Sequence, residues 1–154
     1  MGQDLPDDHI VSFDDLMDAT ADAFIAVELV GCRFEGGFKG AGISVCISDF
    51  SFNGALVVGA DIPGWMDMYL ATVGAEVTVN GEKGNSGTGE AVLGNPAFAL
   101  QWAATEAYSI GMPLKKGDIV STGTMTGVTP VKPGDELMCD FGELGQIPLK
   151  FEAS

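Results

Sequence analysis

One acidic residue stands in an apolar stretch that has the alternation of a β-strand. In IAVELV, residues 25–30, every second side chain is a large apolar one and Glu28 is the one acid. A carboxylate buried in such a strand needs a partner or a metal ion, because an unpaired one takes up a proton. Carboxylate oxygens are hard ligands that suit Mg²⁺. Glu28 is therefore a candidate metal ligand, and the alternative is that it faces solvent or pairs with Arg33 or Lys39.

Other familiar chemistries find no support in the residue types. His9 is the only histidine and lies in an acidic segment, which argues against a nucleophile activated by histidine. Ser86 and Ser121 have no evident base, and no GxSxG motif is present. The glycine-rich stretch at residues 81–94 contains neither GxGxxG before a helix nor GK[ST], so nucleotide binding is not predicted there. The cysteines, which are three in number and far apart, form no zinc-binding pattern and favour reduced thiols.

Composition restricts the class of protein further. The chain has 154 residues, of which 46% are hydrophobic and 19% charged, and this predicts one folded domain with a sizeable core. We expect an acidic, poorly ordered lead-in at residues 1–11 and a single domain over residues 12–154. The net charge of -15 argues against nucleic acid and anionic membranes as partners. Without a basic or apolar N-terminal region, the sequence predicts a cytoplasmic protein with no signal peptide.

The hydrophobic periods predict an α+β fold that is mostly β. Ser12 is a good N-cap for a first helix, and Asn95 followed by Pro96 predicts the start of a second one that ends at Gly111. Asn80-Gly81 is typical of a type I′ hairpin turn. The first helix is expected at residues 13–22, and strands are expected at residues 25–30, 43–48, 55–58, 75–79, 118–122, 136–141 and 147–151.

Several segments, in this order, resemble the 2-keto-4-pentenoate hydratase family of the fumarylacetoacetate hydrolase superfamily. They are AVELVGCR at 26–33, SDFSFNGALVVG at 48–59, GEAVLGNPAFA at 89–99, LKKGDIVSTGTMTGV at 114–128, and PGD with FGELGQIPLKF at 133–151. The resemblance implies a rolled, mixed β-sheet with a barrel-like core and two flanking helices. It also implies a site at the open end of the roll.

The resemblance carries expectations about a metal ion. The family binds Mg²⁺ or Mn²⁺ through three carboxylates, two of them from an E-x-E motif that has no counterpart in this sequence. Glu28 matches the third ligand. The hydratases also use a lysine that precedes the matched segments in the family's sequence, and this lysine has no counterpart here.

Further site residues follow from the resemblance. Lys39 aligns approximately with a family lysine and could hold a substrate carboxylate or polarise an enolate, or it could be a solvated surface lysine. Asp49 aligns with a family aspartate and could position a water or a lysine, or it could bond the next turn. Thr122, Gly123 and Thr124 match the family's substrate-side turn, whose N–H groups and hydroxyl can bind a carboxylate or an enolate oxygen. The alternative for these three is an ordinary glycine turn.

The activity implied by the resemblance is that of a lyase. Such an enzyme adds water to a 2-hydroxy-2,4-dienoate through its 2-keto tautomer, by way of a chelated enolate. Related branches decarboxylate 2-oxo-3-enedioates or hydrolyse acylpyruvates. Two alternatives stay open: a non-catalytic relative or split enzyme completed by a partner chain, and a metal-free isomerase or cyclase that uses Glu28 as its base. The expected partners are a small 2-keto acid and a second subunit, as a homo-oligomer or a partner chain.

Overall fold

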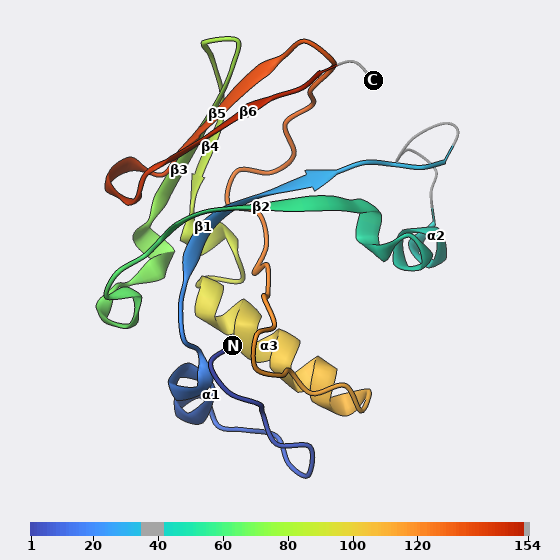
Figure 1. Cartoon of the computed structure of the whole chain (residues 1–154), viewed down its shortest axis with the longest axis vertical. Helices are drawn as coiled ribbons and strands as arrows, with labels where there is room; N and C mark the ends of the chain where they lie inside the picture. The colour runs from blue at the N-terminus through green and yellow to red at the C-terminus, as the bar shows by residue number, and fades with distance from the viewer. Residues whose placement is uncertain (35–41, 153–154) are drawn as a thin grey trace.

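The computed structural model describes residues 1–34 and 42–152, and its elements form two separate antiparallel sheets with three α-helices (Figure 1). Short 3₁₀ turns lie at Trp65–Asp67, Leu70–Thr72, Gly89–Ala91 and Gly142–Leu144. The helices and strands are α1 (Phe13–Ala19), β1 (Phe24–Val30), α2 (Ile43–Ser48), β2 (Asn53–Asp61), β3 (Gly74–Val79), β4 (Glu82–Thr88), α3 (Pro96–Ser109), β5 (Glu136–Asp140) and β6 (Gln146–Lys150). The expected α+β class with mostly β-structure is confirmed.

Strands β1 and β2 make a long two-stranded ribbon that extends from the body and carries α2 at its far end (Figure 1). The near end lies on the larger sheet, where Ile25 and Ile147 belong to one buried cluster. Gly59 of β2 permits this close approach, since a Cβ there would lie 2.8 Å from Ile147 Cδ1 and 2.9 Å from Ile25 Cγ1. The ribbon is therefore anchored at one end and open at the other.

The larger sheet has the order β4-β3-β5-β6, with antiparallel neighbours throughout. Asn80 and Gly81 join β3 to β4 with φ values of 54° and 78°, which confirms the predicted type I′ turn. The Asn80 side chain also donates to Asp135 Oδ1 at 2.9 Å and accepts from the Glu136 N–H at 2.9 Å. The hairpin is thus tied to the start of β5.

A second core cluster joins the N-terminal segment, α1 and α3. Leu16 is only 1% exposed and packs in a cluster with Leu5, Leu100 and Ala104. The helix starts are capped as predicted, because Ser12 accepts from the Asp15 N–H and Asn95 from the Ala97 N–H. No helix within residues 1–34 and 42–152 is both long enough and apolar enough to cross a membrane.

Two strand predictions are wrong. Residues 43–48 form α2 at the end of the ribbon, where the chain reverses its direction between β1 and β2, and no strand of residues 1–34 and 42–152 lies beside them to cover Ile43 and Ile47. Residues 118–122 belong to no strand of the described part of the chain. The N-terminal ammonium group donates to the Asp118 carbonyl at 2.6 Å, and the Gly117 N–H donates to the Met1 carbonyl at 2.9 Å.

The start of the chain is better held than its composition predicts. The Gly2 N–H donates to the Ala19 carbonyl at 2.7 Å, and the Leu5 N–H donates to the Leu114 carbonyl at 2.9 Å. Leu5 itself is buried. Burial of Leu5 and these two backbone hydrogen bonds attach the first residues of the acidic segment to α1 and to the chain near Leu114.

Candidate active site

Glu28 lies midway along β1 and its side chain is exposed. Its Oε1 accepts a hydrogen bond of 2.7 Å from Nδ2 of Asn53, the first residue of β2. The expected burial of Glu28 is wrong, because within the described residues β1 and β2 form a sheet of two strands that leaves its side chain exposed. Arg33, one of the partners considered for it, binds a different carboxylate, and Lys39, the other, lies outside the described residues.

Asp49 follows α2 and is almost completely buried. Its Oδ1 accepts from Arg33 Nη1 at 2.8 Å, and its buried Oδ2 has no hydrogen-bond partner within the described part of the chain. Arg33 also donates from Nη2 to the Asn53 carbonyl at 3.0 Å. One guanidinium thus joins Asp49 to the residue that binds Glu28.

The backbone between Asp49 and Asn53 is unusual. Phe50, Ser51 and Phe52 all have positive φ values, of 51°, 56° and 62°. L-residues rarely adopt this left-handed region, and non-glycine residues do so at a cost of about 1 kcal/mol or more each. The turn is closed by a 2.8 Å hydrogen bond from the Phe52 N–H to the Asp49 carbonyl.

The turn formed by Thr122, Gly123 and Thr124 is attached to a different region. A Cβ at Gly123 would lie 3.4 Å from Val92 Cγ1, which follows β4, and the φ of Gly123 is +125°. The Thr124 hydroxyl donates to the Gly127 carbonyl at 3.1 Å and accepts from the Thr126 N–H at 3.3 Å, so it stabilises its own loop. No hydrogen bond given for the described residues joins this turn to Glu28 or Asp49.

Lys39 lies outside the described residues, so its position in the site stays a prediction. Arg33 and Asn53 were not expected as site residues: Arg33 was considered only as a partner for Glu28. Two signals could have found them. Arg33 is the only arginine of the chain, and Asn53 lies in the same SDFSFNG segment as Asp49.

The residues present do not by themselves fit a divalent cation. No group of three or more histidine, cysteine, aspartate or glutamate side chains within residues 1–34 and 42–152 is placed to hold a metal ion. Glu28 offers one carboxylate, while Mg²⁺ takes near-octahedral coordination. The Asp49 carboxylate is already neutralised by Arg33.

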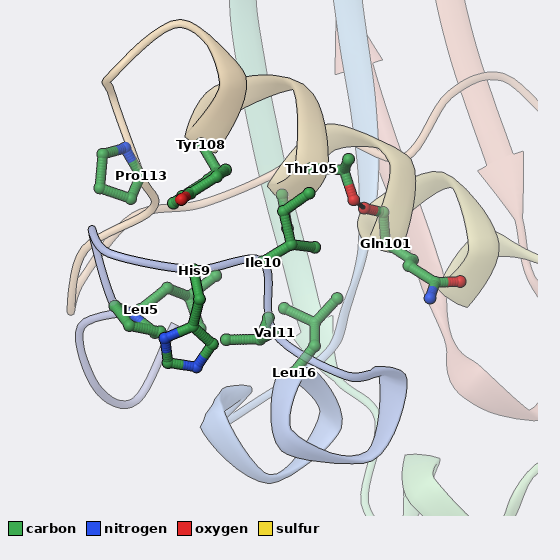
Figure 2. Close-up of a pocket in the computed structure, with 11 residues that line it drawn as sticks. Leu5, His9, Ile10, Val11, Leu16, Gln101, Thr105, Tyr108 and Pro113 are labelled. Atoms are coloured by element: carbon green, nitrogen blue, oxygen red, sulfur yellow. Dashed lines mark hydrogen bonds between the residues drawn. The ribbon is translucent and has the colours of Figure 1, made fainter.

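Two hollows on the surface lie away from Glu28. The first, between the N-terminal segment and α3, has a volume of about 10 Å³, enough for one water molecule at most (Figure 2). Its lining includes Leu5, Leu16, Tyr108 and His9. The His9 ring bonds to the neighbouring Asp8. The second is a shallow groove beside β3 whose lining includes Glu76, Asp140 and Glu143, a poor environment for an anionic acid. Neither hollow has the character of a 2-keto acid site.

Comparisons with known proteins are consistent with the resemblance. The 2-keto-4-pentenoate hydratase of Paraburkholderia phymatum is 31% identical over 140 residues, which are 91% of this chain and 53% of the relative. The 4-oxalocrotonate decarboxylase of Pseudomonas sp. CF600 is 31% identical over 125 residues, 81% of this chain and 47% of the relative.

Solved structures agree with the fold. A structure of 4-oxalocrotonate decarboxylase from Pseudomonas putida G7, complexed with calcium and acetate, superposes with a TM-score of 0.81 at 25% identity over 97% of this chain and 54% of that one. A second structure of that enzyme, complexed with magnesium and adipate, gives a TM-score of 0.80 at 26% identity, over 90% of this chain and 52% of that one. The chain therefore spans about half the length of the relatives it matches.

The sequence match to a defined family covers almost the whole chain. Residues 8–151 match the fumarylacetoacetate (FAA) hydrolase C-terminal family. The segments that carry the resemblance all fall within this range, from β1 to the end of β6. On the match and the superposition together, this chain belongs to the fumarylacetoacetate hydrolase C-terminal family.

Proposed function

We propose that this chain is a hydratase-like lyase component that acts on a 2-hydroxy-2,4-dienoate or a related 2-keto acid, with Glu28 as its central carboxylate. The observation that carries the proposal is the presentation of Glu28 to solvent on β1, fixed by the 2.7 Å bond from Asn53. Relatives named 2-keto-4-pentenoate hydratase and 4-oxalocrotonate decarboxylase support this class of reaction.

The proposed reaction passes through an enolate. The dienoate takes up a proton at C5 as its C2 hydroxyl loses one, which gives the 2-keto-3-enoate. The oxygen of water then bonds to C4, the C3=C4 electron pair shifts to C2–C3, and the C2 carbonyl pair moves onto oxygen. Protonation at C3 restores the C2 carbonyl and gives the 4-hydroxy-2-keto acid, so that one water is added in total.

The chain's own residues would share three tasks. Glu28 would act at the C1–C2 end of the substrate, where the enolate charge develops. Lys39 and the N–H groups of the turn formed by Thr122, Gly123 and Thr124 would bind the carboxylate or the enolate oxygen. Asp49 would act indirectly, through Arg33, since its carboxylate is almost completely buried.

We further propose that Glu28 is one ligand of Mg²⁺ or Mn²⁺ and that the remaining ligands come from outside the described residues. The metal-bound relatives of known structure support a divalent cation. When bound, such a cation would supply positive charge that lowers the energy of the enolate. A metal-free isomerase or cyclase is less well supported, because Glu28 is exposed and lacks the apolar surroundings on which that alternative depends.

A second copy of the chain is the partner we propose for the open end of the ribbon. Ile43, Ile47 and Phe50 are exposed there, by 79%, 68% and 82%. Apolar side chains gathered in this way are typical of interfaces. Because each copy carries a charge of -15, salt should strengthen the association. Light scattering at several concentrations and salt levels tests this, and a monomer under all conditions contradicts it.

The activity is tested by following dienoate consumption in the ultraviolet with the full chain, with added Mg²⁺ and then with excess EDTA. We expect turnover that needs the metal and falls at least 100-fold in Glu28→Gln. Glu106→Gln is the matched control, since Glu106 is an exposed carboxylate on α3, far along the chain from the site. Loss of activity in both variants alike, or full activity in Glu28→Gln, contradicts the proposal.

A further inference from the structure

We propose that Arg33 is a positioning residue: its guanidinium joins the two ends of the left-handed turn at Phe50–Phe52 and thereby holds the Asn53 amide against Glu28. The inference deepens the proposed function and rests on it for the importance of Glu28. It concerns only side chains and backbone groups whose contacts the structure gives.

The turn needs an external restraint. Three successive residues with positive φ, none of them glycine, form a conformation that the local sequence disfavours. Such conformations persist only where the surrounding structure holds them, and they are common at functional sites. Phe52 is buried and holds one side of the turn, whereas Ser51, the middle residue, is exposed, so packing of the Ser51 side chain does not restrain its left-handed conformation.

Arg33 contacts both ends of the turn with one planar group. Nη1 binds the Asp49 carboxylate at 2.8 Å just before the turn, and Nη2 binds the Asn53 carbonyl at 3.0 Å just after it. The donors of a guanidinium have a fixed separation, so the two bonds set the distance between the ends. A lysine ammonium, which is a single point, could keep one bond but not the same span.

The buried Asp49 makes this contact stronger than a surface ion pair. Only 11% of the Asp49 side chain is exposed, compared with 56% for Arg33. Within the described residues, Oδ2 of Asp49 has no hydrogen-bond partner, and Arg33 is the one positive charge that contacts this carboxylate. Removing the guanidinium would leave a buried charge uncompensated and would release the turn.

The effect reaches Glu28 through Asn53. The Asn53 backbone carbonyl is bound by Arg33, and the side-chain amide of the same residue donates to Glu28 Oε1. Asn53 also pairs with Val30 across the ribbon, and the Gly31 N–H binds the Phe52 carbonyl at 2.9 Å. Arg33 adds the bond to the Asn53 carbonyl itself, and through it contributes to the direction of the Asn53 amide.

The experiment is nuclear magnetic resonance of the ¹⁵N-labelled full chain, observing side-chain amide pairs. The chain has four asparagines and three glutamines, so the pairs are few, and Asn53→Ala identifies the one that matters. We expect the Asn53 pair to shift in Glu28→Gln and to shift in the same direction in Arg33→Gln. Lys83→Gln, which removes the Lys83–Glu76 pair on the other sheet, should leave it in place.

Two further variants separate positioning from simple loss of fold. Arg33→Lys should give a partial shift, because the ion pair survives and the span does not. In the Arg33→Gln background, Ser51→Gly should move the Asn53 pair back toward its original position, because glycine adopts the left-handed conformation without steric cost. If Arg33→Gln alone does not fold, Arg33→Lys and the double variant still decide the matter.

The inference is overturned if the chemical shifts of the Asn53 amide pair are unchanged in the folded Arg33 variants. It is also overturned if the double variant does not move these chemical shifts back toward their original values. These results do not depend on turnover or on metal. If Arg33 moves the Asn53 pair while Glu28→Gln keeps full activity, the proposed function fails and the positioning stands. If Glu28→Gln loses activity while substitution of Arg33 leaves the chemical shifts of the Asn53 amide pair unchanged, the positioning fails and the proposed function stands.

Discussion

Gly87→Ala should destabilise the fold by forcing two backbone segments apart. A Cβ at Gly87 of β4 would lie 1.9 Å from the Met125 carbonyl oxygen and 3.0 Å from its carbon. Ordinary contact begins at 3.4 Å, so the segments must separate by about 1.5 Å, the difference between 3.4 and 1.9. Because both groups belong to backbone, no side chain can rotate away, and we expect a cost of about 2–3 kcal/mol.

Gly74→Ala is the control for this substitution. Gly74 lies in β3 of the same hairpin and pairs with Thr88, and a Cβ added to it would meet no other atom within 4 Å. Alanine there should be neutral or slightly stabilising, because it only reduces the freedom of the unfolded chain. Urea unfolding of both variants, compared at equal slope, measures the difference in the free energy of unfolding.

The Gly87 variant also tests the candidate substrate-binding turn. Met125 directly follows Thr124, so the forced separation should displace this turn from β4 and lower turnover as well as stability. An unfolding midpoint for Gly87→Ala equal to that of Gly74→Ala would refute the reasoning. It would mean that the 115–130 segment is free to move away from the sheet at no cost.

Three other substitutions or reactions test separate parts of the fold. Leu16→Ala should lower the free energy of unfolding by about 2–5 kcal/mol in urea, since Leu16 is 1% exposed. The hydrogen bond from Asn80 lowers the pKa of Asp135. The ionised carboxylate therefore stabilises the fold above the ordinary pKa of 3.8, and this contribution is lost as the pH falls through the lowered pKa. Asp135→Asn should reduce the free energy of unfolding at pH 7 and flatten its dependence on pH below 3.8, as unfolding measured at several pH values would show. Burial raises the pKa of Cys139, so iodoacetamide should alkylate it more slowly than the less buried Cys32 at pH 8, as peptide mass analysis would show.

The sequence predicted elements well where local chemistry and burial agree. The helix after Asn95 has its cap, its proline and its closing Gly111, whose φ is 74°. The Asn80-Gly81 turn and the strand before it follow from the same kind of local signal, whereas β4 after the turn was not predicted as a strand because its sequence is rich in glycine. The first helix ends at Ala19, three residues before its expected end, because the backbone of Thr20 is extended and its N–H closes the last turn on the Met17 carbonyl.

Predictions failed where a distant segment decides the structure. Residues 43–48 have the β-branched composition of a strand, but at the end of the ribbon no strand of the described residues pairs with them. Near residues 118–122, the N-terminal ammonium group binds the Asp118 carbonyl, a contact over more than 100 residues that no local pattern contains.

For the candidate site, residue types led to Glu28 and Asp49 but not to the hydrogen bonds that connect them. Glu28 and Asp49 lie at the two ends of one network, but the groups that connect them are Arg33 and the backbone and amide of Asn53. The left-handed turn that brings these groups together is formed by phenylalanine and serine, which give no signal for positive φ. The burial expected for Glu28 followed from its apolar strand, and on β1 the side chain is exposed.

Calorimetric titration of the full chain with Mn²⁺ and Mg²⁺ tests the central claim, that Glu28 is a metal ligand of a 2-keto acid lyase site, most directly. The titration is repeated on Glu28→Gln and on the control Glu106→Gln. We predict saturable binding that is lost in Glu28→Gln and kept in Glu106→Gln. Binding that is unchanged in Glu28→Gln, or that is absent from all of the proteins, contradicts the claim.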